Sequence, residues 1–380
     1  MIFKYLIDTQ GIDNILYIVP SVDLANQSAE QYERYESYLK KHNHNWEIGI
    51  LRSGLTKKQK EKVESCNILF GTFQSLCKRK KEFFDRFKAC ICDECHHAGG
   101  AVSVKNILYN MSNLIYSIGV TGTFPKESMY ENLYIQSIIG PVIYKLTANQ
   151  LINTEKRGTP IYAVIQYLKW ADQKTKETMY IYRANKNPMN IGAGSKVLKI
   201  ERKTVNESYT RLKYICDQVI KTKKNALVLF GDIKYGYGRK VYDYIKDNSD
   251  KNVYYTDGNT PNKTRDYYKA EMEKDISGNT VIVASINTFG EGIDIKNLWS
   301  IFLVDTAKSE RLVRQICGRG IRLYPGKDKV VIFDFVDDLR YSADPNKRYK
   351  DNYLWKHGQE RKKIYLEQHF PVYEQKIDFK

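Results

Sequence analysis

The sequence predicts an α/β protein with two parallel sheets, and three observations support this fold class. Short apolar runs of about four to seven β-rich residues recur along the chain, each followed by a turn and a polar, helix-like stretch. These runs do not alternate with polar residues, which is typical of strands buried on both faces. The runs fall into two sets with a basic stretch between them, so two domains are expected for 380 residues.

The first set of expected strands lies in residues 1–145, which we expect to form the first domain. Its runs are Ile15–Val19, Ile48–Leu51, Ile68–Phe70, Ala89–Cys92 and Ile115–Val120. Because helix-like segments separate the runs, the strands are expected to pair in parallel.

The second set lies in residues 216–340, the expected second domain. Its runs are Ala226–Phe230, Val281–Ala284, Ile301–Val304 and Val330–Phe333. Residues 146–215 are expected to form a basic connecting region, because residues 151–215 hold 13 Lys and Arg against 5 Asp and Glu. Residues 341–380 are expected to form a helical C-terminal tail, since a helical pattern surrounds Tyr353–Gln368.

Composition narrows the class of protein and of partner. The chain has 61 Lys and Arg against 44 Asp and Glu, a net charge of +17, which favours a polyanionic partner such as nucleic acid. An AT-rich genome, which yields many Lys, Asn and Tyr, would explain the same surplus. Seven cysteines inside apolar runs favour a reduced, cytoplasmic protein over a disulfide framework. The amino-terminal residues do not form a signal peptide, and no apolar run approaches the ~18 residues of a membrane span.

The strongest local signal is the segment Ala89-Cys-Ile-Cys-Asp93-Glu94-Cys95-His96-His97. An apolar strand that ends in two adjacent carboxylates suits a nucleoside triphosphatase. The first carboxylate can hold Mg²⁺, which favours oxygen ligands, and the second can act as general base on the attacking water. A zinc site built from Cys92, Cys95 and the two histidines is the competing interpretation.

A second signal is Gln315-Ile-Cys-Gly318-Arg319-Gly320-Ile-Arg322. Two arginines three positions apart share one face of a helix, and guanidinium groups presented in this way suit the γ-phosphate of a triphosphate. Taken alone, the string is also typical of the start of a basic helix.

Together, these strings resemble the ordered motifs of superfamily 2 DNA helicases of the DExH type. Asp93-Glu94-Cys95-His96 resembles motif II, and Gln315-x-x-Gly318-Arg319-x-x-Arg322 resembles motif VI. Motifs Ia, Ib, III and V are matched by Ile18-Val-Pro20-Ser21, Gly71-Thr72-Phe-Gln-Ser75, Thr121-Gly-Thr123 and the segment from Ser285 to Ile295. The ending Gly-Ile-Asp-Ile-Lys-Asn-Leu at residues 292–298 is most similar to the phage UvsW-type DNA helicases.

The resemblance implies two RecA-like domains, with ATP and Mg²⁺ bound between them, and a role for each matched residue. In the nucleotide site, Asp93 would hold Mg²⁺, Glu94 would orient water, Gln315, Arg319 and Arg322 would close over the γ-phosphate, and Gly292 and Asp294 would lie near the nucleotide. His96, Thr121 and Thr123 would couple that site to DNA, and Pro20, Ser21, Gly71, Thr72 and Thr288 would contact DNA phosphates without reading sequence.

The sequence departs from the family in one respect, because the 380 residues contain no Gly-x-x-x-x-Gly-Lys-Ser/Thr phosphate loop. The nearest imitation, Gly192-Ala-Gly194-Ser195-Lys196, lacks the spacing. Only 17 residues precede Ile18, so a truncated or split reading frame is expected, with an upstream polypeptide supplying the loop. In the family picture the strand that feeds the loop lies beside the Asp-Glu strand, so unpaired backbone groups are expected in the middle of the first sheet.

We therefore expect an ATP-dependent DNA helicase or translocase, acting on single-stranded or branched DNA, as in phage recombination and repair inside an infected bacterial host. Two alternatives remain. The first is a DNA-binding helicase homologue that hydrolyses nothing, and the second is the motor subunit of a restriction-type nuclease. Asp334, Asp337 and Asp338 could suggest a nuclease centre, but no Glu-x-Lys follows at a suitable spacing, which favours a polar strand end.

Overall fold

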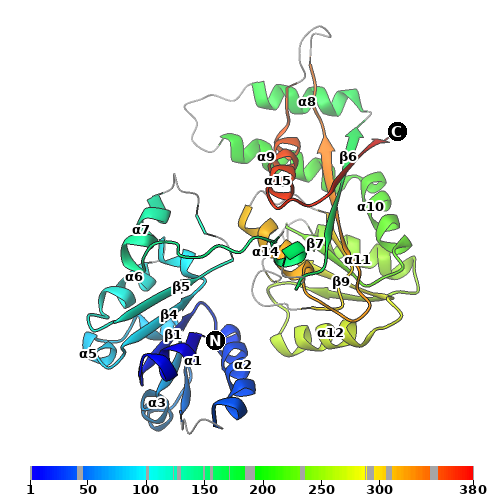
Figure 1. Cartoon of the computed structure of the whole chain (residues 1–380). Coiled ribbons are helices and arrows are strands. Elements are labelled where there is room, and N and C mark those ends of the chain that lie inside the picture. The colour runs from blue at the N-terminus through cyan, green and yellow to red at the C-terminus, as the bar shows by residue number, and fades with distance from the viewer. Residues whose placement is uncertain are drawn as a thin grey trace. The chain divides into compact units, whose positions relative to one another are not determined.

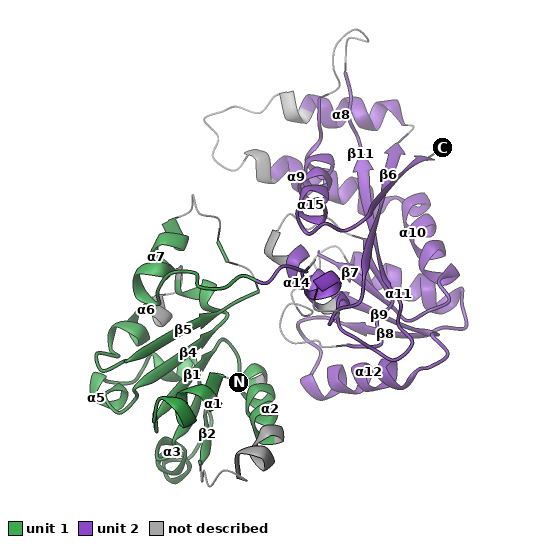
Figure 2. Ribbon diagram, in the orientation of Figure 1, with its two compact units in different colours: residues 1–145 green, residues 146–380 purple. Residues whose placement is uncertain are grey.

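The structure is a computed structural model that forms two compact units, Met1–Lys145 and Leu146–Lys380 (Figure 2). It describes all residues apart from 1, 41–45, 100–101, 123, 126–129, 149, 155–156, 171, 185–192, 232–235, 287, 289–294, 305–309, 343–349 and 380. Within that part of the chain, no helix combines the length and the apolar character needed to cross a membrane.

Unit 1 is built on a five-stranded parallel sheet in the order β2-β3-β1-β4-β5 (Figure 1). The strands are β1 (Ile15–Val19), β2 (Ile48–Leu51), β3 (Ile68–Thr72), β4 (Ala89–Asp93) and β5 (Tyr116–Val120). The helices are α1 (Ile2–Lys4), η1 (Tyr5–Thr9), α2 (Val22–Lys40), α3 (Lys57–Glu64), α4 (Phe73–Leu76), α5 (Lys81–Phe84), η2 (Cys95–Gly99), α6 (Val102–Tyr109) and α7 (Tyr130–Ile138). All five strands predicted for this domain are confirmed.

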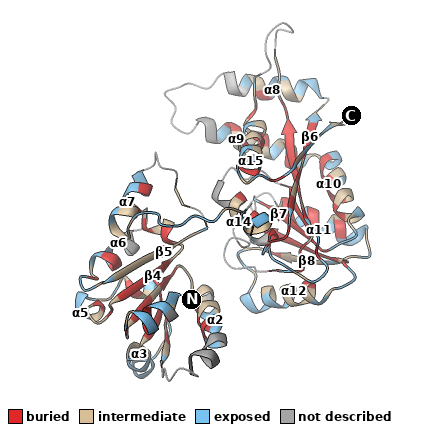
Figure 3. Cartoon of the chain, in the orientation of Figure 1, coloured by how far each residue is buried: buried red, intermediate tan, exposed pale blue. Residues whose placement is uncertain are grey.

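Helices cover both faces of this sheet, which explains the continuous apolar runs of its strands. Leu16 and Ile18 of β1 face a core with α4, α5, α6 and α7, whereas Ile15 and Val19 face η1 and α2. The central strands are therefore almost wholly buried (Figure 3). Because both faces are covered, polar side chains of the central strands reach solvent at the ends of the strands.

The expectation of unpaired backbone groups in the middle of this sheet is wrong. β4 pairs in parallel with β1 on one side, in the register Ile18↔Cys92, and with β5 on the other, in the register Cys92↔Gly119. The chain's own β1 fills the place beside the Asp-Glu strand. The open edges of the sheet lie instead at β2 and β5, each of which has one neighbour among the described strands.

Unit 2 contains a seven-stranded parallel sheet in the order β12-β6-β11-β10-β7-β9-β8. The strands are β6 (Ile161–Trp170), β7 (Ala226–Phe230), β8 (Asn252–Thr256), β9 (Thr280–Ser285), β10 (Ser300–Leu303), β11 (Val330–Asp338) and β12 (Val372–Phe379). The helices are η3 (Gln150–Thr154), α8 (Gln173–Ala184), α9 (Ala193–Glu207), α10 (Tyr209–Lys221), α11 (Tyr237–Asp247), α12 (Asn262–Lys274), α14 (Glu310–Gly320) and α15 (Tyr353–Glu367). The helix expected in the tail is confirmed as α15.

The connecting region and the tail both contribute to this second sheet. β6 lies between β11 and β12, and its pairing with β11 runs from Ile161↔Val330 to Lys169↔Asp338. α10 and α11 pack on one face of the sheet, while α14 and α15 pack on the other. The four strands predicted for residues 216–340 are confirmed, whereas β6, β8 and β12 were not predicted.

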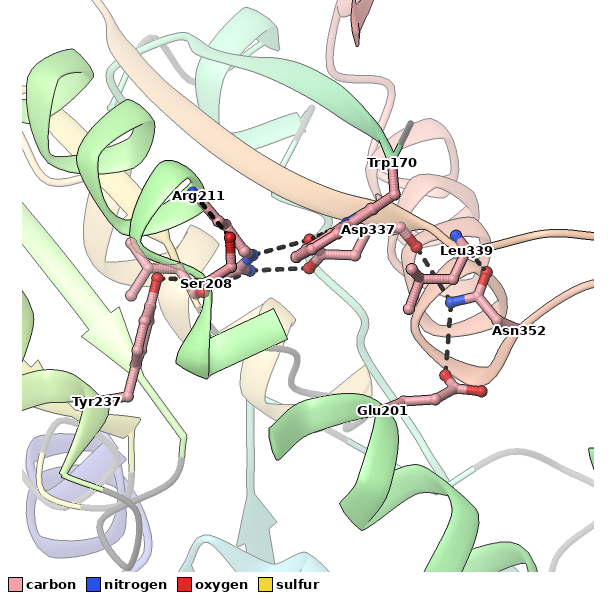
Figure 4. A network of polar contacts seen from close by, with 9 residues as sticks. Trp170, Glu201, Ser208, Arg211, Tyr237, Asp337, Leu339 and Asn352 are labelled. Atoms are coloured by element: carbon pink, nitrogen blue, oxygen red, sulfur yellow. Dashed lines mark hydrogen bonds and ion pairs between the residues drawn. The ribbon is translucent and has the colours of Figure 1, made fainter. Parts of the chain in front are cut away.

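Three aspartates of β11 are each paired with an arginine, which supports the interpretation as a strand end rather than a nuclease centre. Arg361 contacts Asp334 at 2.6 Å and Arg340 contacts Asp338 at 2.8 Å. Arg211 forms two 2.8 Å bonds to the buried Asp337 (Figure 4).

The same network fastens the connecting region to the second sheet. Arg211 also donates to the Tyr237 hydroxyl at 2.7 Å, and the Trp170 indole donates to Asp337 at 3.1 Å. On the far side of β11, Asn352 donates to the buried Glu201 of α9 at 3.4 Å (Figure 4). Buried polar contacts therefore hold α10 to β11 and α9 to the residue that precedes α15.

Candidate functional site

The Asp-Glu pair lies where β4 ends, at the carboxyl edge of the first sheet. Asp93 is the last residue of β4, and Glu94 begins a turn with a φ of +50°. This left-handed conformation costs roughly 1–2 kcal/mol for a residue with a side chain, so the surrounding contacts must hold it. One such contact is the Glu94 N–H, which donates to Asp93 Oδ1 at 2.9 Å.

Asp93 is also contacted by a residue that the sequence analysis did not select. The Tyr17 hydroxyl on the neighbouring strand β1 donates to Asp93 Oδ2 at 3.3 Å. Burial raises the pKa of Asp93, and the hydrogen bond from the backbone of Glu94 opposes that shift. Burial also raises the pKa of Tyr17, so its hydroxyl stays protonated and acts as the donor. Only the strand order reveals this contact, because Tyr17 lies 76 positions from Asp93.

Glu94, His96 and Thr121 form a triangle of short contacts. The Thr121 hydroxyl donates to Glu94 Oε2 at 3.2 Å. His96 Nδ1 lies 2.7 Å from that hydroxyl and 3.1 Å from the same Glu94 oxygen. A hydrogen on Nδ1 satisfies both acceptors. The structure thus brings together four residues that the sequence selected, from the ends of β4 and β5, into one site.

The cysteines of this segment are enclosed by packing. Cys95 lies against Gly119 of β5, where an added Cβ would come within 2.9 Å of the Cys95 Sγ. Burial raises the pKa of Cys95 to about 12 and that of Cys92 well above its usual value, so both thiols are protonated in this environment. Among the described residues, no group of three or more His, Cys, Asp and Glu side chains is placed to hold a metal ion.

Pro20, Ser21, Gly71 and Thr72 lie at the carboxyl ends of β1 and β3, on the same edge as Asp93. The hydroxyls of Ser21 and Thr72 cap the first turns of the helices that follow. Ser21 Oγ accepts the Leu24 N–H at 3.3 Å, and Thr72, which is buried, accepts the Ser75 N–H at 3.3 Å. Gly71 has a packing reason to be glycine, since a Cβ there would lie 2.7 Å from Leu76.

The residues predicted for the second domain lie in unit 2. Gln315 is half-buried in α14, and Arg322 is exposed just beyond its end. Thr288 is buried, and its hydroxyl lies 2.6 Å from that of Ser285. Thr123, Gly292, Asp294 and the side chain of Arg319 lie outside the described residues.

Comparison with known proteins assigns the two units to known families. Residues 1–126 match the family described as type III restriction enzyme, res subunit, and residues 210–324 match the helicase conserved C-terminal domain. The chain is 29% identical over 375 residues to the ATP-dependent DNA helicase uvsW of Enterobacteria phage T4, covering 96% of this chain and 68% of that protein.

The chain belongs to helicase superfamily 2.

A second relative of this superfamily 2 chain is the putative ATP-dependent helicase IRC3 of Saccharomyces cerevisiae, which is 24% identical over 72% of this chain and 38% of the relative. Solved structures support the fold. The ATP-dependent type ISP restriction-modification enzyme LlaBIII bound to DNA superposes with a TM-score of 0.63 at 14% identity, over 97% of this chain and 28% of that one. Dbp5 of S. cerevisiae bound to RNA and ADP BeF3 superposes with a TM-score of 0.56 at 13% identity, over 97% of this chain and 78% of that one. The prediction of two RecA-like parallel-sheet domains is confirmed.

Proposed function

We propose that this superfamily 2 chain acts as an ATP-dependent DNA helicase or translocase. The observation that carries the proposal is the triangle of Glu94, His96 and Thr121 beside Asp93. Glu94 is the general base in this proposal, because its carboxylate is held in place by two neighbours at the edge where parallel sheets bind ligands. His96 and Thr121 hold the Glu94 side chain and relay its position to β5 and the residues that follow.

Asp93 fits the role of a Mg²⁺ ligand. Its carboxylate offers oxygen atoms to a hard cation, and the bonds from Glu94 and Tyr17 leave further lone pairs on both oxygens. Bound Mg²⁺ would neutralise charge on the phosphates of ATP. A nearby cation would also favour the charged form of Asp93, against the effect of burial.

Unit 2 contains the residues to which the family resemblance assigns contacts with the triphosphate. Gln315, Arg319 and Arg322 on α14 and at its end are proposed to contact the γ-phosphate, and Gly292 and Asp294 to lie near the rest of the nucleotide. Two cationic fingers on one short segment can stabilise the charge that spreads over the transferred phosphoryl group. Thr123 is proposed to act with Thr121 in coupling this site to DNA.

The DNA partner is proposed from the relatives and from the charge of the chain. The T4 relative is by name a DNA helicase, and the LlaBIII structure has DNA bound. Pro20, Ser21, Gly71, Thr72 and Thr288 are proposed to contact DNA phosphates. Backbone N–H groups and hydroxyls would be the donors, except at Pro20, which has neither. α9 adds an exposed basic face made of Lys196, Lys199 and Lys203.

A phosphate loop for this site is proposed to come from another polypeptide segment. The 380 residues contain no Gly-x-x-x-x-Gly-Lys-Ser/Thr. β5 has one edge without a neighbour among the described strands, and a parallel strand added there would end beside Thr121. A loop at that point would lie near the Glu94 carboxylate.

Two other functions have specific support. The missing loop favours a DNA-binding homologue that hydrolyses nothing. The match to the res subunit of type III restriction enzymes, together with the fold of LlaBIII, favours the motor subunit of a restriction-type nuclease. The arginine pairing of the three β11 aspartates means that such a nuclease centre would have to lie elsewhere.

ATP hydrolysis measured with and without DNA tests the proposal. We expect negligible turnover from the 380 residues alone, and DNA-stimulated turnover once a segment carrying the phosphate loop is joined to the chain. Glu94→Gln should abolish that turnover, and Glu61→Gln, on the exposed surface of α3, should leave it unchanged. Robust Glu94-dependent turnover by the 380 residues alone would refute the need for an added loop. If the chain joined to the phosphate-loop segment binds DNA but does not hydrolyse ATP, that result would favour the non-hydrolysing homologue.

A further inference from the structure

Lys327 is an enclosed lysine that the proposed mechanism does not yet use. Its side chain is buried, with 8% of the residue exposed, in the turn between α14 and β11. The ammonium group has three hydrogens, and three backbone carbonyls accept them. They are the carbonyls of Arg322 at 2.8 Å, Gly320 at 3.0 Å and Lys296 at 3.1 Å. Every donor of this buried cation is therefore satisfied.

The three carbonyls belong to the two segments that carry predicted nucleotide contacts. Gly320 ends α14 and Arg322 is one of the two proposed phosphate fingers, while Lys296 follows Asp294 by two positions. Lys327 therefore connects the end of one segment to the end of the other. Its position at the carboxyl end of α14, where the helix dipole is negative, favours a positive charge.

A second set of contacts joins residues 295–297 to α12. Together with the three bonds of Lys327, we call this group of contacts the node. Glu273, near the end of α12, accepts the backbone N–H groups of Lys296 and Asn297. The Tyr324 hydroxyl donates to the Glu273 carbonyl at 3.1 Å. Residues 295–297 are thus held from one side by Glu273 and from the other by Lys327. Among the described residues, Glu273 is also the charged side chain that acts on the ammonium group.

We propose that Lys327 is a positioning residue, whose ammonium group fastens the end of α14, and with it Arg322, to residues 295–297. The inference rests on the proposed function for the importance of Arg322, but the contact itself does not require nucleotide. The fastening would keep Arg322 in a fixed relation to residues 295–297, which follow Asp294 in the sequence.

The charge on Lys327 gives this fastening a pH signature. Burial lowers the pKa of Lys327 to about 8, although the nearby Glu273 opposes the shift. When the node opens, the ammonium group returns to water, where a lysine has a pKa of about 10.4. Opening therefore takes up a proton between about pH 8 and pH 10, so it becomes less favourable as the pH rises through that window.

Amide hydrogen exchange on the full chain, read peptide by peptide, tests the proposal without ATP. In Lys327→Met, which keeps the aliphatic stem, exchange in residues 295–297 and 318–324 should rise about 10- to 100-fold at pH 7, as expected for losing charged hydrogen bonds. Peptides from β7 and β9 should not change. Lys329→Met removes an exposed charge two positions away and is the matched control.

Two further measurements separate fastening from general stabilisation. In the parent chain, exchange in the two segments, corrected for the intrinsic rate, should slow as the pH rises from 8 to 9.5, and Lys327→Met should lose this dependence. Lys327→Arg, which stays charged, should recover part of the protection and show no pH dependence. The proposal is overturned if Lys327→Met leaves both segments unchanged, or if β7 and β9 peptides loosen equally. If Lys327→Met does not fold, the parent chain still tests the proposal. Exchange in the parent that does not slow between pH 8 and 9.5 would overturn the proposal.

Discussion

The exposed basic face of α9 makes DNA binding the property most open to a quantitative test. Lys196, Lys199 and Lys203 are exposed and recur at spacings of three and four, so they lie on one side of the helix. Val197 and Val205 are buried on the opposite side. The helix is therefore oriented with its lysines outward, as a surface that contacts phosphates would require.

The perturbation is the replacement of Lys196, Lys199, Arg202 and Lys203 by Gln. Each phosphate contact contributes about 0.7 to the log–log salt slope on single strands and about 0.9 on duplex. Arg202 is half-buried, so about three contacts are expected, and the slope should flatten by about 2 to 3. Over a fourfold rise in salt, a slope change of about 2.5 corresponds to roughly 30-fold in the affinity ratio.

Fluorescence anisotropy of labelled single-stranded and duplex DNA, measured from about 50 to 200 mM salt, reads out this slope. Binding should need no ATP and should vary little with base sequence. The control replaces Lys57, Lys58 and Lys62, exposed lysines of α3 in unit 1, and should change the slope much less. If the α9 variant's titration overlays that of the parent, this face is a solvated surface and plays no part in binding.

Two predictions concern the stability of unit 2, and chemical denaturation followed by circular dichroism measures both. Asp337→Asn removes the carboxylate that pairs with the buried Arg211 and should lower the free energy of unfolding by about 3–5 kcal/mol. Asp243→Asn, in the exposed pair with Arg239, is the control and should lower it by at most about 1 kcal/mol. Equal losses in the two variants would contradict the burial argument. Gly358→Ala would place a Cβ within 2.5 Å of the Val336 methyl groups and should lower the free energy of unfolding by about 1–3 kcal/mol. Adding Val336→Ala should recover part of that loss, and no recovery would contradict the packing explanation.

The strands that the sequence revealed are those buried on both faces. β1, β4, β7 and β9 are mostly apolar because helices cover both sides, so each contains an uninterrupted apolar run. β12 lies at an edge and exposes most of its side chains, which gives the sequence Val-Tyr-Glu-Gln-Lys-Ile-Asp-Phe little apolar signal. β6 is apolar, but the lysines and arginines around it were interpreted as a connecting region.

The candidate site was predictable where its residues are near in sequence or end neighbouring strands. Asp93, Glu94 and His96 are consecutive or nearly so, and Thr121 directly follows β5, the next strand along the chain. Tyr17 and Lys327 could not be found in this way. The contact of Tyr17 depends on β1 lying beside β4, and that of Lys327 depends on the path of a turn, so both require the three-dimensional arrangement.

The parallel pairing of β6 with β12 also affects how the protein forms during synthesis. Gln166 of β6 and its partner Gln375 of β12 are 209 positions apart. At about 5–20 residues per second, a ribosome needs roughly 10–40 s to make the residues between them. During that interval the apolar edge of β6 has no β12 to cover it, and such exposed edges promote misassembly. Slow translation or early chain termination between β6 and β12 would therefore favour aggregation of unit 2.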